Sequence, residues 1–210
     1  MISIYDHPSD FTILQAEDKD PFDLPVIQLN RVAQYREGMG SDRRIHIRGQ
    51  ITHRGLGSML FVQDETAALR IMSKYANELE LGQIVDIAGF LEFENHLPFL
   101  NDGVFKNPTP SEISIIPAKV PTAEIKAGLH HGEIVTLSGK VLDRTTRPIL
   151  NAQGDNIGEA TTWLIQGEAL SFTAEYESLV STPHLSAPIG STIDATGVCY
   201  SEIDPQVSLR

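Results

Sequence analysis

The sequence contains one short phrase twice, as "LGQIVDIAGF" at residues 81–90 and as "IGSTIDATGV" at residues 189–198. Each copy has a glycine, an aspartate four positions later and a second glycine seven positions after the first: Gly82, Asp86 and Gly89, then Gly190, Asp194 and Gly197. A phrase that recurs at long spacing predicts two copies of one supersecondary unit. We expect the aspartate to point to solvent, between buried apolar neighbours on a strand.

Two further segments recur in the same order. "IHIRGQIT" (45–52) matches "VTLSGKVL" (135–142), and "LFVQDETAALRI" (60–71) matches "WLIQGEALSF" (163–172) with two residues fewer. The offset between the copies grows from 90 residues at Gly49 and Gly139 to 108 residues at Gly82 and Gly190. The second copy therefore contains extra residues, and segment 145–160 is predicted to hold them as a long, exposed hairpin.

Each copy predicts β-structure. "RIHIRGQIT" alternates apolar and polar residues, "MLFVQ" and "ALRIM" flank a polar turn, and "GQIVDIAGF" and "HLPFLNDGVFKN" predict two more strands. Five short strands with glycines at bends favour a closed barrel of the OB type over a generic sandwich or an SH3-like barrel. We therefore predict an all-β protein of two tandem OB-like five-stranded barrels, at roughly residues 43–117 and 132–203, with short connecting helices at 29–38 and 122–128.

The predicted domains are an N-terminal arm (1–24), a first OB-like domain (25–118) and a second one (119–210). Within the arm, "SDFTIL" (9–14) resembles "SEISII" (111–116), which we expect to close the first barrel region. The arm is accordingly a candidate for the closing strand of a further barrel, and a chance match of six residues is the alternative.

Composition narrows the class of protein. The 210 residues are 41% hydrophobic and 21% charged, a globular balance, and the net charge of −12 makes nucleic acid an unlikely partner for the whole chain. Charge is uneven, because residues 31–54 carry six arginines against two acidic residues. The single cysteine excludes an internal disulfide and leaves the compartment open. The sequence has no signal peptide and no apolar run of membrane-spanning length.

The sequence offers no group of residues that predicts a catalytic site or a metal site. Asp64 and Glu65 lie in a predicted turn, where such residues are favoured for solvation. His130 and Glu133, in "HHGE", are zinc-ligand types, but nothing nearby in the sequence completes a tetrahedral set. Cys199 is predicted to be a small buried residue on a strand. With no phosphate-binding loop, dinucleotide fingerprint or G-x-S-x-G, we predict a non-enzyme without cofactor or metal.

Single-stranded nucleic-acid binding is the alternative function, because OB barrels stack bases on aromatic side chains within a basic groove. The second and third predicted strands offer few such groups: Phe61, Arg70, Lys74 and Tyr75. The arginine run would suit phosphate, although a solvated strand face explains it equally: Arg43, Arg44, Arg48 and Arg54.

The segment "DRRIHIRGQITHRGLGSMLFVQDETAALRIMSKYANELELGQIVDIAGFLEFENHLPFLNDGVF" resembles the tandem OB-like part of the extracytoplasmic region of bacterial sensor histidine kinases. Residues 44–49 fit that family's R-V-x-V-x-G, residues 60–66 fit its L-F-x-Q-D-x-T, and residues 81–89 fit its L-x-x-G-D-x-V-x-V-x-G. The continuation "PTAEIKAGLHHGEIVTLSGKVLD" and the late "TGVC" match as well. Ala67-Ala68 departs from the usual Gly-Gly, and Gln83 from the usual Asp.

The resemblance implies a non-catalytic input region cut from a membrane-bound receptor, on the periplasmic side of a bacterial inner membrane; a cytoplasmic location is the alternative. It implies a small ligand or protein partner, a homodimer, and membrane attachment through other parts of the parent chain. The family assigns no catalytic group to this region. Candidate binding residues on the barrel face and loops are Arg48, His53, Arg54, Phe61, Gln63, Arg70 and Trp163.

Overall fold

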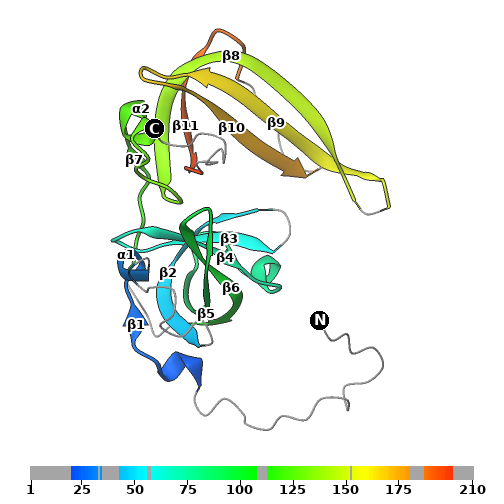
Figure 1. Ribbon diagram of the computed structural model, residues 1–210. Coiled ribbons are helices and arrows are strands. Elements are labelled where there is room, and N and C mark those ends of the chain that lie inside the picture. The colour runs from blue at the N-terminus through cyan, green and yellow to red at the C-terminus, as the bar shows by residue number, and fades with distance from the viewer. Residues whose placement is uncertain are drawn as a thin grey trace.

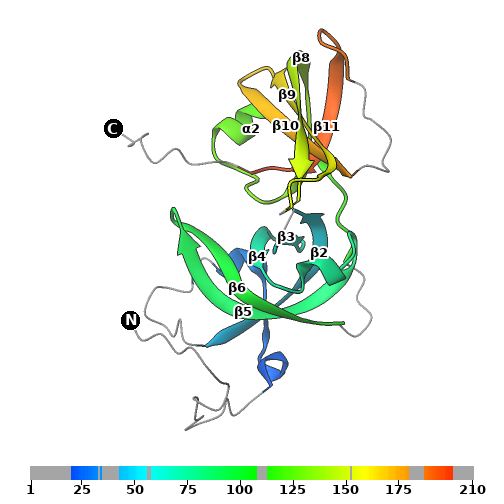
Figure 2. The same ribbon diagram turned by 90° about the vertical axis from the view of Figure 1, so that its right-hand side faces the viewer.

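The computed structural model describes residues 20–32, 34, 43–55, 58–107, 113–151, 153–179 and 187–200. Two β-units lie one above the other, the first running from η2 to β6 and the second from β7 to β11 (Figure 1; Figure 2 shows the view turned by 90°). Most described residues belong to strands, which confirms the all-β prediction. The predicted strand "SDFTIL" lies outside the described residues.

The first unit is a closed five-stranded barrel. Its elements are η2 (Pro21–Asp23), β1 (Val26–Ile27), α1 (Leu29–Val32), β2 (Arg44–Arg54), β3 (Met59–Gln63), β4 (Ala68–Met72), η3 (Ala76–Glu78), β5 (Ile84–Glu94) and β6 (Leu97–Lys106). The strand order is β2-β3-β4-β6-β5, and β5 pairs back with β2. The β4–β6 pair is parallel and the other barrel pairs are antiparallel. β1 pairs in parallel with a part of β2 that β3 does not reach.

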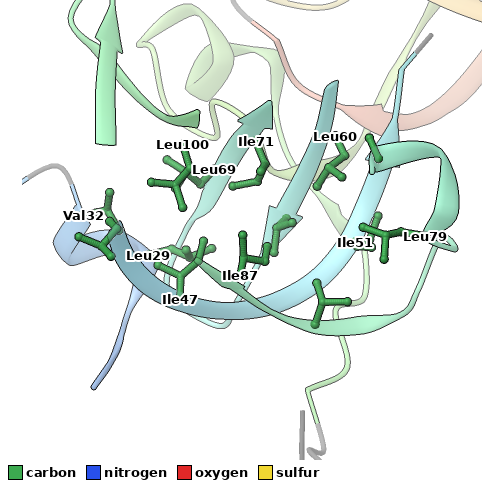
Figure 3. Packing of buried hydrophobic residues seen from close by; sticks show 14 residues of the cluster. Leu29, Val32, Ile47, Ile51, Leu60, Leu69, Ile71, Leu79, Ile87 and Leu100 are labelled. Atoms are coloured by element: carbon green, nitrogen blue, oxygen red, sulfur yellow. The ribbon is translucent and has the colours of Figure 1, made fainter. Parts of the chain in front are cut away.

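Branched aliphatic side chains fill this barrel. They alternate along β2, β4 and β5, so that the inward face of each strand is apolar (Figure 3). The helix α1 adds two buried side chains at one end of the barrel. The buried cluster comprises Leu29, Val32, Ile45, Ile47, Ile51, Leu60, Val62, Leu69, Ile71, Ala76, Leu79, Val85, Ile87 and Leu100.

The second unit is a half-barrel. Its elements are β7 (Ala118–Lys119), α2 (Thr122–Lys126), β8 (Ile134–Leu150), β9 (Asn156–Gln166), β10 (Ser171–Leu179) and β11 (Thr192–Val198). The strand order is β10-β9-β8-β11, and β7 pairs in parallel with β8. Within the described part of the chain no strand joins β10 to β11, so a second five-stranded barrel is not confirmed. Its buried cluster is small: Val141, Trp163, Ile165 and Ala187.

The glycines at the centres of β2 and β8 occupy equivalent positions. A Cβ atom placed on Gly49 would lie 2.5 Å from Cγ1 of Val62, and one placed on Gly139 would lie 2.5 Å from Cγ2 of Ile165. Both glycines let a neighbouring strand cross closely where the sheet coils. The register shifts two residues later in each strand, at Ile51/His53 and Val141/Asp143.

The turn glycines of the doubled phrase are equivalent too. Gly82 has a φ of 83° and its N–H donates to the carbonyl of Ile51; Gly190 has a φ of 90° and its N–H donates to the carbonyl of Val141. Each takes a left-handed conformation that favours glycine. The repeat identified in the sequence is therefore a structural repeat of turn and strand.

The extra residues of the second copy lie in the β8–β9 hairpin, as predicted. Most of it is exposed, although Ile149 and Ala160 are buried. The turns before β4 and β10 are of equal length, because Gln63 pairs with Ala68 as Gln166 pairs with Ser171. The expectation that this stretch is two residues shorter in the second copy is therefore wrong.

Two other local expectations need correction. α1 ends at Val32, and residues 33 and 35–38 of the helix predicted at 29–38 lie outside the described part. In the closing strand predicted at 111–116, residues 113–116 have no regular structure, because β6 closes the first barrel instead, and residues 111–112 lie outside the described part. The helix expected at 122–128 is present as α2. No helix among the described residues is long and apolar enough to cross a membrane.

Candidate functional site

The outer face of β3 and β4 contacts the second unit. The ring centroids of Phe61 and Tyr200 lie 6.0 Å apart in an edge-to-face arrangement, and those of His131 and Tyr200 lie 5.3 Å apart. The side chain of Phe61 is buried, with 2% of its surface exposed. We call this contact the junction; Gln63, Arg70, Gly132 and Ile134 also belong to it.

Polar groups give the junction a defined geometry. The N–H of Ile134 donates to Oε1 of Gln63 at 2.9 Å, and Nη1 of Arg70 donates to the hydroxyl of Tyr200 at 3.3 Å. Gly132 has a φ of 80°, and a Cβ there would lie 3.3 Å from the Cβ of Ala68. The backbone before β8 thus approaches β4 at a distance that leaves little room for a side chain.

The junction uses three of the predicted binding residues, Phe61, Gln63 and Arg70. Their side chains contact the second unit of the same chain, so the barrel face on which we expected a ligand is covered by protein. Sequence reasoning missed Tyr200 and His131. Tyr200 follows the repeated phrase and carries no pattern of its own, and His131 belongs to "HHGE", whose residue types suggest a metal ligand rather than a contact between units.

The other predicted binding residues are not brought to the same place. His53 lies 6.1 Å from Phe61 between ring centroids, and burial lowers the pKa of its imidazole. Arg54 donates from Nη1 to the carbonyl of Leu79 at 2.7 Å, beside η3. Trp163 lies in the interior of the second unit. The seven candidates therefore do not form one site.

The junction and the arginine contacts lead to a prediction for nucleic acid. Phe61 is covered by Tyr200, and Arg48 and Arg54 are held by protein acceptors. In a fluorescence-anisotropy titration at physiological salt, single-stranded DNA or RNA should bind no more tightly than about 10⁻⁴ M, the weak end of non-specific binding. Tight binding that is lost in the double variant Arg48→Ala, Arg54→Ala would contradict this expectation.

A buried ionic cluster joins β2 and β5 of the first barrel. Nε and Nη2 of Arg48 donate to the two oxygens of Asp86 at 2.6 and 2.9 Å. Nε2 of His46 lies 3.4 Å from the same carboxylate, and its Nδ1 lies 2.8 Å from the carbonyl of Leu24. Phe22 packs edge-on against His46. The segment at η2 thus covers the cluster.

The repeated aspartates differ in environment. Only 8% of the Asp86 side chain is exposed, so the expectation that it points to solvent is wrong; the covering segment accounts for this. Burial raises the pKa of Asp86, but hydrogen bonds and charge from Arg48, aided by His46, outweigh burial and bring it below its ordinary value. Asp194 is exposed as expected, and hydrogen bonds from Lys119 and Ser138 lower its pKa.

His130 is held between two carboxylates just before the junction. Its Nε2 lies 2.7 Å from Oε2 of Glu124 in α2, and its Nδ1 lies 2.8 Å from Oε2 of Glu133. The hydrogen bond to Glu124, followed by that to Glu133, raises the pKa of this imidazole. Protonation lets both ring nitrogens donate, which ties α2 to the start of β8.

The His130 contacts predict a pH-dependent contribution to stability. Because the pKa is raised on folding, the stabilisation is complete below the unfolded value of about 6.5 and is lost as pH rises through the folded pKa. The stability difference between the native chain and His130→Gln should be larger at acidic than at alkaline pH, by no more than about 1 kcal/mol since Glu124 is partly exposed. Urea unfolding at the two pH values measures it. Glu133→Gln should reduce the pH dependence, and a pH-independent difference would contradict the prediction.

The acidic pair in the β3–β4 turn has a structural role. Oδ1 of Asp64 accepts from the N–H groups of Thr66 and Ala67, and its Oδ2 accepts from the N–H of Leu29 at the start of α1. Asp64 thus fixes the turn and the start of α1. Cys199 is half-buried just after β11. Among the described residues, no three His, Cys, Asp or Glu side chains form a group that could hold a metal ion.

Comparison with known proteins adds little. No protein-family model and no curated protein matches the chain. One similar solved chain, described as "Structural mimicry for functional antagonism", has 9% identity and a TM-score of 0.36, over 78% of this chain and 87% of that one. Another, described as "Molecular basis for abrogation of activation of pro-inflammatory cytokines", has 11% identity and a TM-score of 0.35, over 77% and 94%. Likeness at this level carries no argument about function.

Proposed function

We propose that this chain is a non-catalytic input region, of the extracytoplasmic kind found in bacterial sensor histidine kinases, which recognises a small ligand or a protein. It consists of two OB-like units, acts as a homodimer, and is attached to the inner membrane through other parts of the parent protein. Single-stranded nucleic-acid binding in the cytoplasm is the alternative.

The strand order of the first unit supports the OB-like assignment. Five strands close a barrel in which β4 and β6 pair in parallel and all other neighbours are antiparallel. The second unit repeats the first four barrel strands with the same central glycine and the same register shift. Such barrels serve as binding platforms in many proteins, and function lies in the site rather than in the fold.

The junction is the observation that carries the sensing proposal. Residues before β8 and after β11 both contact β3 and β4, so movement of the second unit changes the position of Tyr200 directly. A ligand that prefers one arrangement of the two units would shift the chain that follows Tyr200. Transmission then requires no chemistry within the barrels.

The parent protein provides the test. We expect the reading frame to continue beyond Arg210 into a membrane-spanning helix and a kinase core. In membrane preparations of the parent protein, Tyr200→Ala should change the basal rate of autophosphorylation by at least about fivefold. A fivefold change is the lower end of the effect that one coupled site typically has on another.

Tyr176→Ala is the matched control, because Tyr176 is a partly exposed tyrosine on β10. We expect it to leave the autophosphorylation rate unchanged. A parent protein without a kinase core, or an unaltered rate in Tyr200→Ala with normal folding, would overturn the proposal. A nuclease or helicase domain in the same reading frame would favour the nucleic-acid alternative.

A further inference from the structure

Two adjacent histidines just before β8 have opposite surroundings. His130 lies between the carboxylates of Glu124 and Glu133, which both belong to the second unit. The ring centroid of His131 lies 5.3 Å from that of Tyr200, at the contact with the first unit. The contacts of His130 are thus internal to the second unit, whereas those of His131 change if the two units separate.

Tyr200 brings His131 together with a cation of the first unit. Nη1 of Arg70, on β4, donates to the hydroxyl of Tyr200 at 3.3 Å. The other terminal nitrogen of Arg70 pairs with Glu94 on β5, and only 16% of the Arg70 side chain is exposed. A proton on His131 would therefore place a second positive charge beside a largely buried guanidinium that belongs to the other unit.

The closed junction opposes protonation of His131. Burial lowers the pKa of this imidazole, and the positive charge of Arg70 lowers it further. Both causes end when the units separate, because the imidazole regains water and moves away from the guanidinium. The closed junction therefore has its full stability above the ordinary imidazole value of about 6.5, and it loses stability as pH falls below that value.

His130 responds to pH with the opposite sign. Its two carboxylate partners raise its pKa, so acid strengthens the contacts of α2 with the start of β8. A weakening of the junction by acid therefore does not come from His130. It comes from a group that the closed junction holds in its neutral form.

We propose that the junction is a pH-sensitive contact, closed when His131 is neutral and opened by acid while both units stay folded. Glu94 pairs with Arg70, and Glu133 pairs with His130. Protonation of His131 thus adds a like charge to the Arg70 side of the contact. The charged and titratable groups around it, among the described residues, are His53 on β2, Arg70 on β4, Glu94 on β5, Tyr200, His130 and Glu133.

The opening concerns the isolated chain and does not require a kinase in the parent protein. Within the proposed function it makes acidity an input, and it rests on that function only for this role. A test on the 210-residue chain therefore separates the two ideas. Junction opening without a kinase core in the parent would leave the pH-sensitive contact standing and remove the receptor.

Hydrogen exchange at one amide measures the opening. The N–H of Ile134 donates across the junction to Oε1 of Gln63, so its exchange requires this contact to open. The exchange rate divided by the intrinsic rate at the same pH gives the opening constant. Between about pH 7.5 and about pH 5.5 this constant should rise by up to about tenfold, the limit for an imidazole that is protonated only in the open state. An unchanged or smaller constant at acidic pH would overturn the proposal.

Two variants assign the pH dependence to one histidine. His131→Phe keeps a ring against Tyr200 but takes up no proton, so its opening constant should be equal at the two pH values; His131→Asn replaces it if the phenylalanine variant does not fold. His53→Phe is the matched control, because burial also lowers the pKa of His53, which lies beside Phe61. It should keep the rise. A rise that persists in His131→Phe, or that disappears in His53→Phe, would overturn the proposal.

A second amide shows whether the second unit itself stays folded. The N–H of Val141 donates to the carbonyl of Ser191 within that unit. Its opening constant should be the same at the two pH values, while that of Ile134 rises. A parallel rise at both amides would mean that acid unfolds the second unit, and the junction would then not be a separate pH-sensitive contact.

Discussion

Asp86→Ala should lower the free energy of unfolding by about 3 kcal/mol, because removing one partner of a buried ion pair leaves the other charge unpaired. Arg48 would lose both of its carboxylate hydrogen bonds, and His46 would lose its nearest anion. The native pairing keeps the pKa of Asp86 low, so its contribution is present above the unfolded value of about 3.9 and disappears as pH falls through the folded pKa. Urea unfolding of the native chain and the variant at neutral and acidic pH measures both effects.

Asp194→Ala is the matched control, since it removes the aspartate from the same position of the second copy. Its carboxylate pairs with Lys119 in solvent, and exposed pairs of this kind contribute little. We expect no resolvable shift of the urea midpoint. Similar losses at Asp86 and Asp194, or an Asp86→Ala loss unchanged at acidic pH, would contradict the interpretation of the buried cluster.

Gly49→Ala and Gly139→Ala should each destabilise the chain by about 2–3 kcal/mol, because the new methyl group overlaps a packed neighbour. At Gly49 it would lie 2.9 Å from the carbonyl oxygen of Gln63, and at Gly139 it would lie 2.7 Å from that of Gln166. The strand must move to relieve these contacts, since a backbone atom cannot rotate away. Thermal or urea unfolding of the two single variants measures the loss.

Lys140→Ala serves as the control, because its exposed side chain follows Gly139 on the same strand. A change within about 0.5 kcal/mol is expected there. If either glycine variant were as stable as the native chain, the close crossing of strands described for that copy would be wrong.

Much of the strand plan could be predicted from the sequence because it rests on local chemistry. Alternating apolar residues and turn glycines at Gly82 and Gly190 identify strands and their ends wherever they lie in space. The burial of Asp86 could not be predicted, because it depends on Phe22 and Leu24 being placed over the barrel by a remote segment. The junction was missed for the same kind of reason: Tyr200 acquires its role only when the two units meet.

The same distinction applies to the predicted binding residues. Phe61 and Arg70 have the residue types and strand positions of a ligand-binding face, and the structure places them on that face. Their partners are nevertheless groups of the same chain. A sequence pattern indicates that a surface is suited to recognition. It does not show whether the surface binds a separate ligand or another part of the same chain.

The chain enters and leaves the second unit at neighbouring points, because Gly132 and Cys199 are joined by a hydrogen bond at the base of the β8–β11 pair. A pulling force applied across these two points would load the hydrogen bonds of that antiparallel pair one after another, as in opening a zipper. Mechanical resistance would be low in that direction and would begin with the Gly132–Cys199 bond. Tension on the chain after Tyr200 would therefore detach this corner of the half-barrel before it disturbed the closed barrel below.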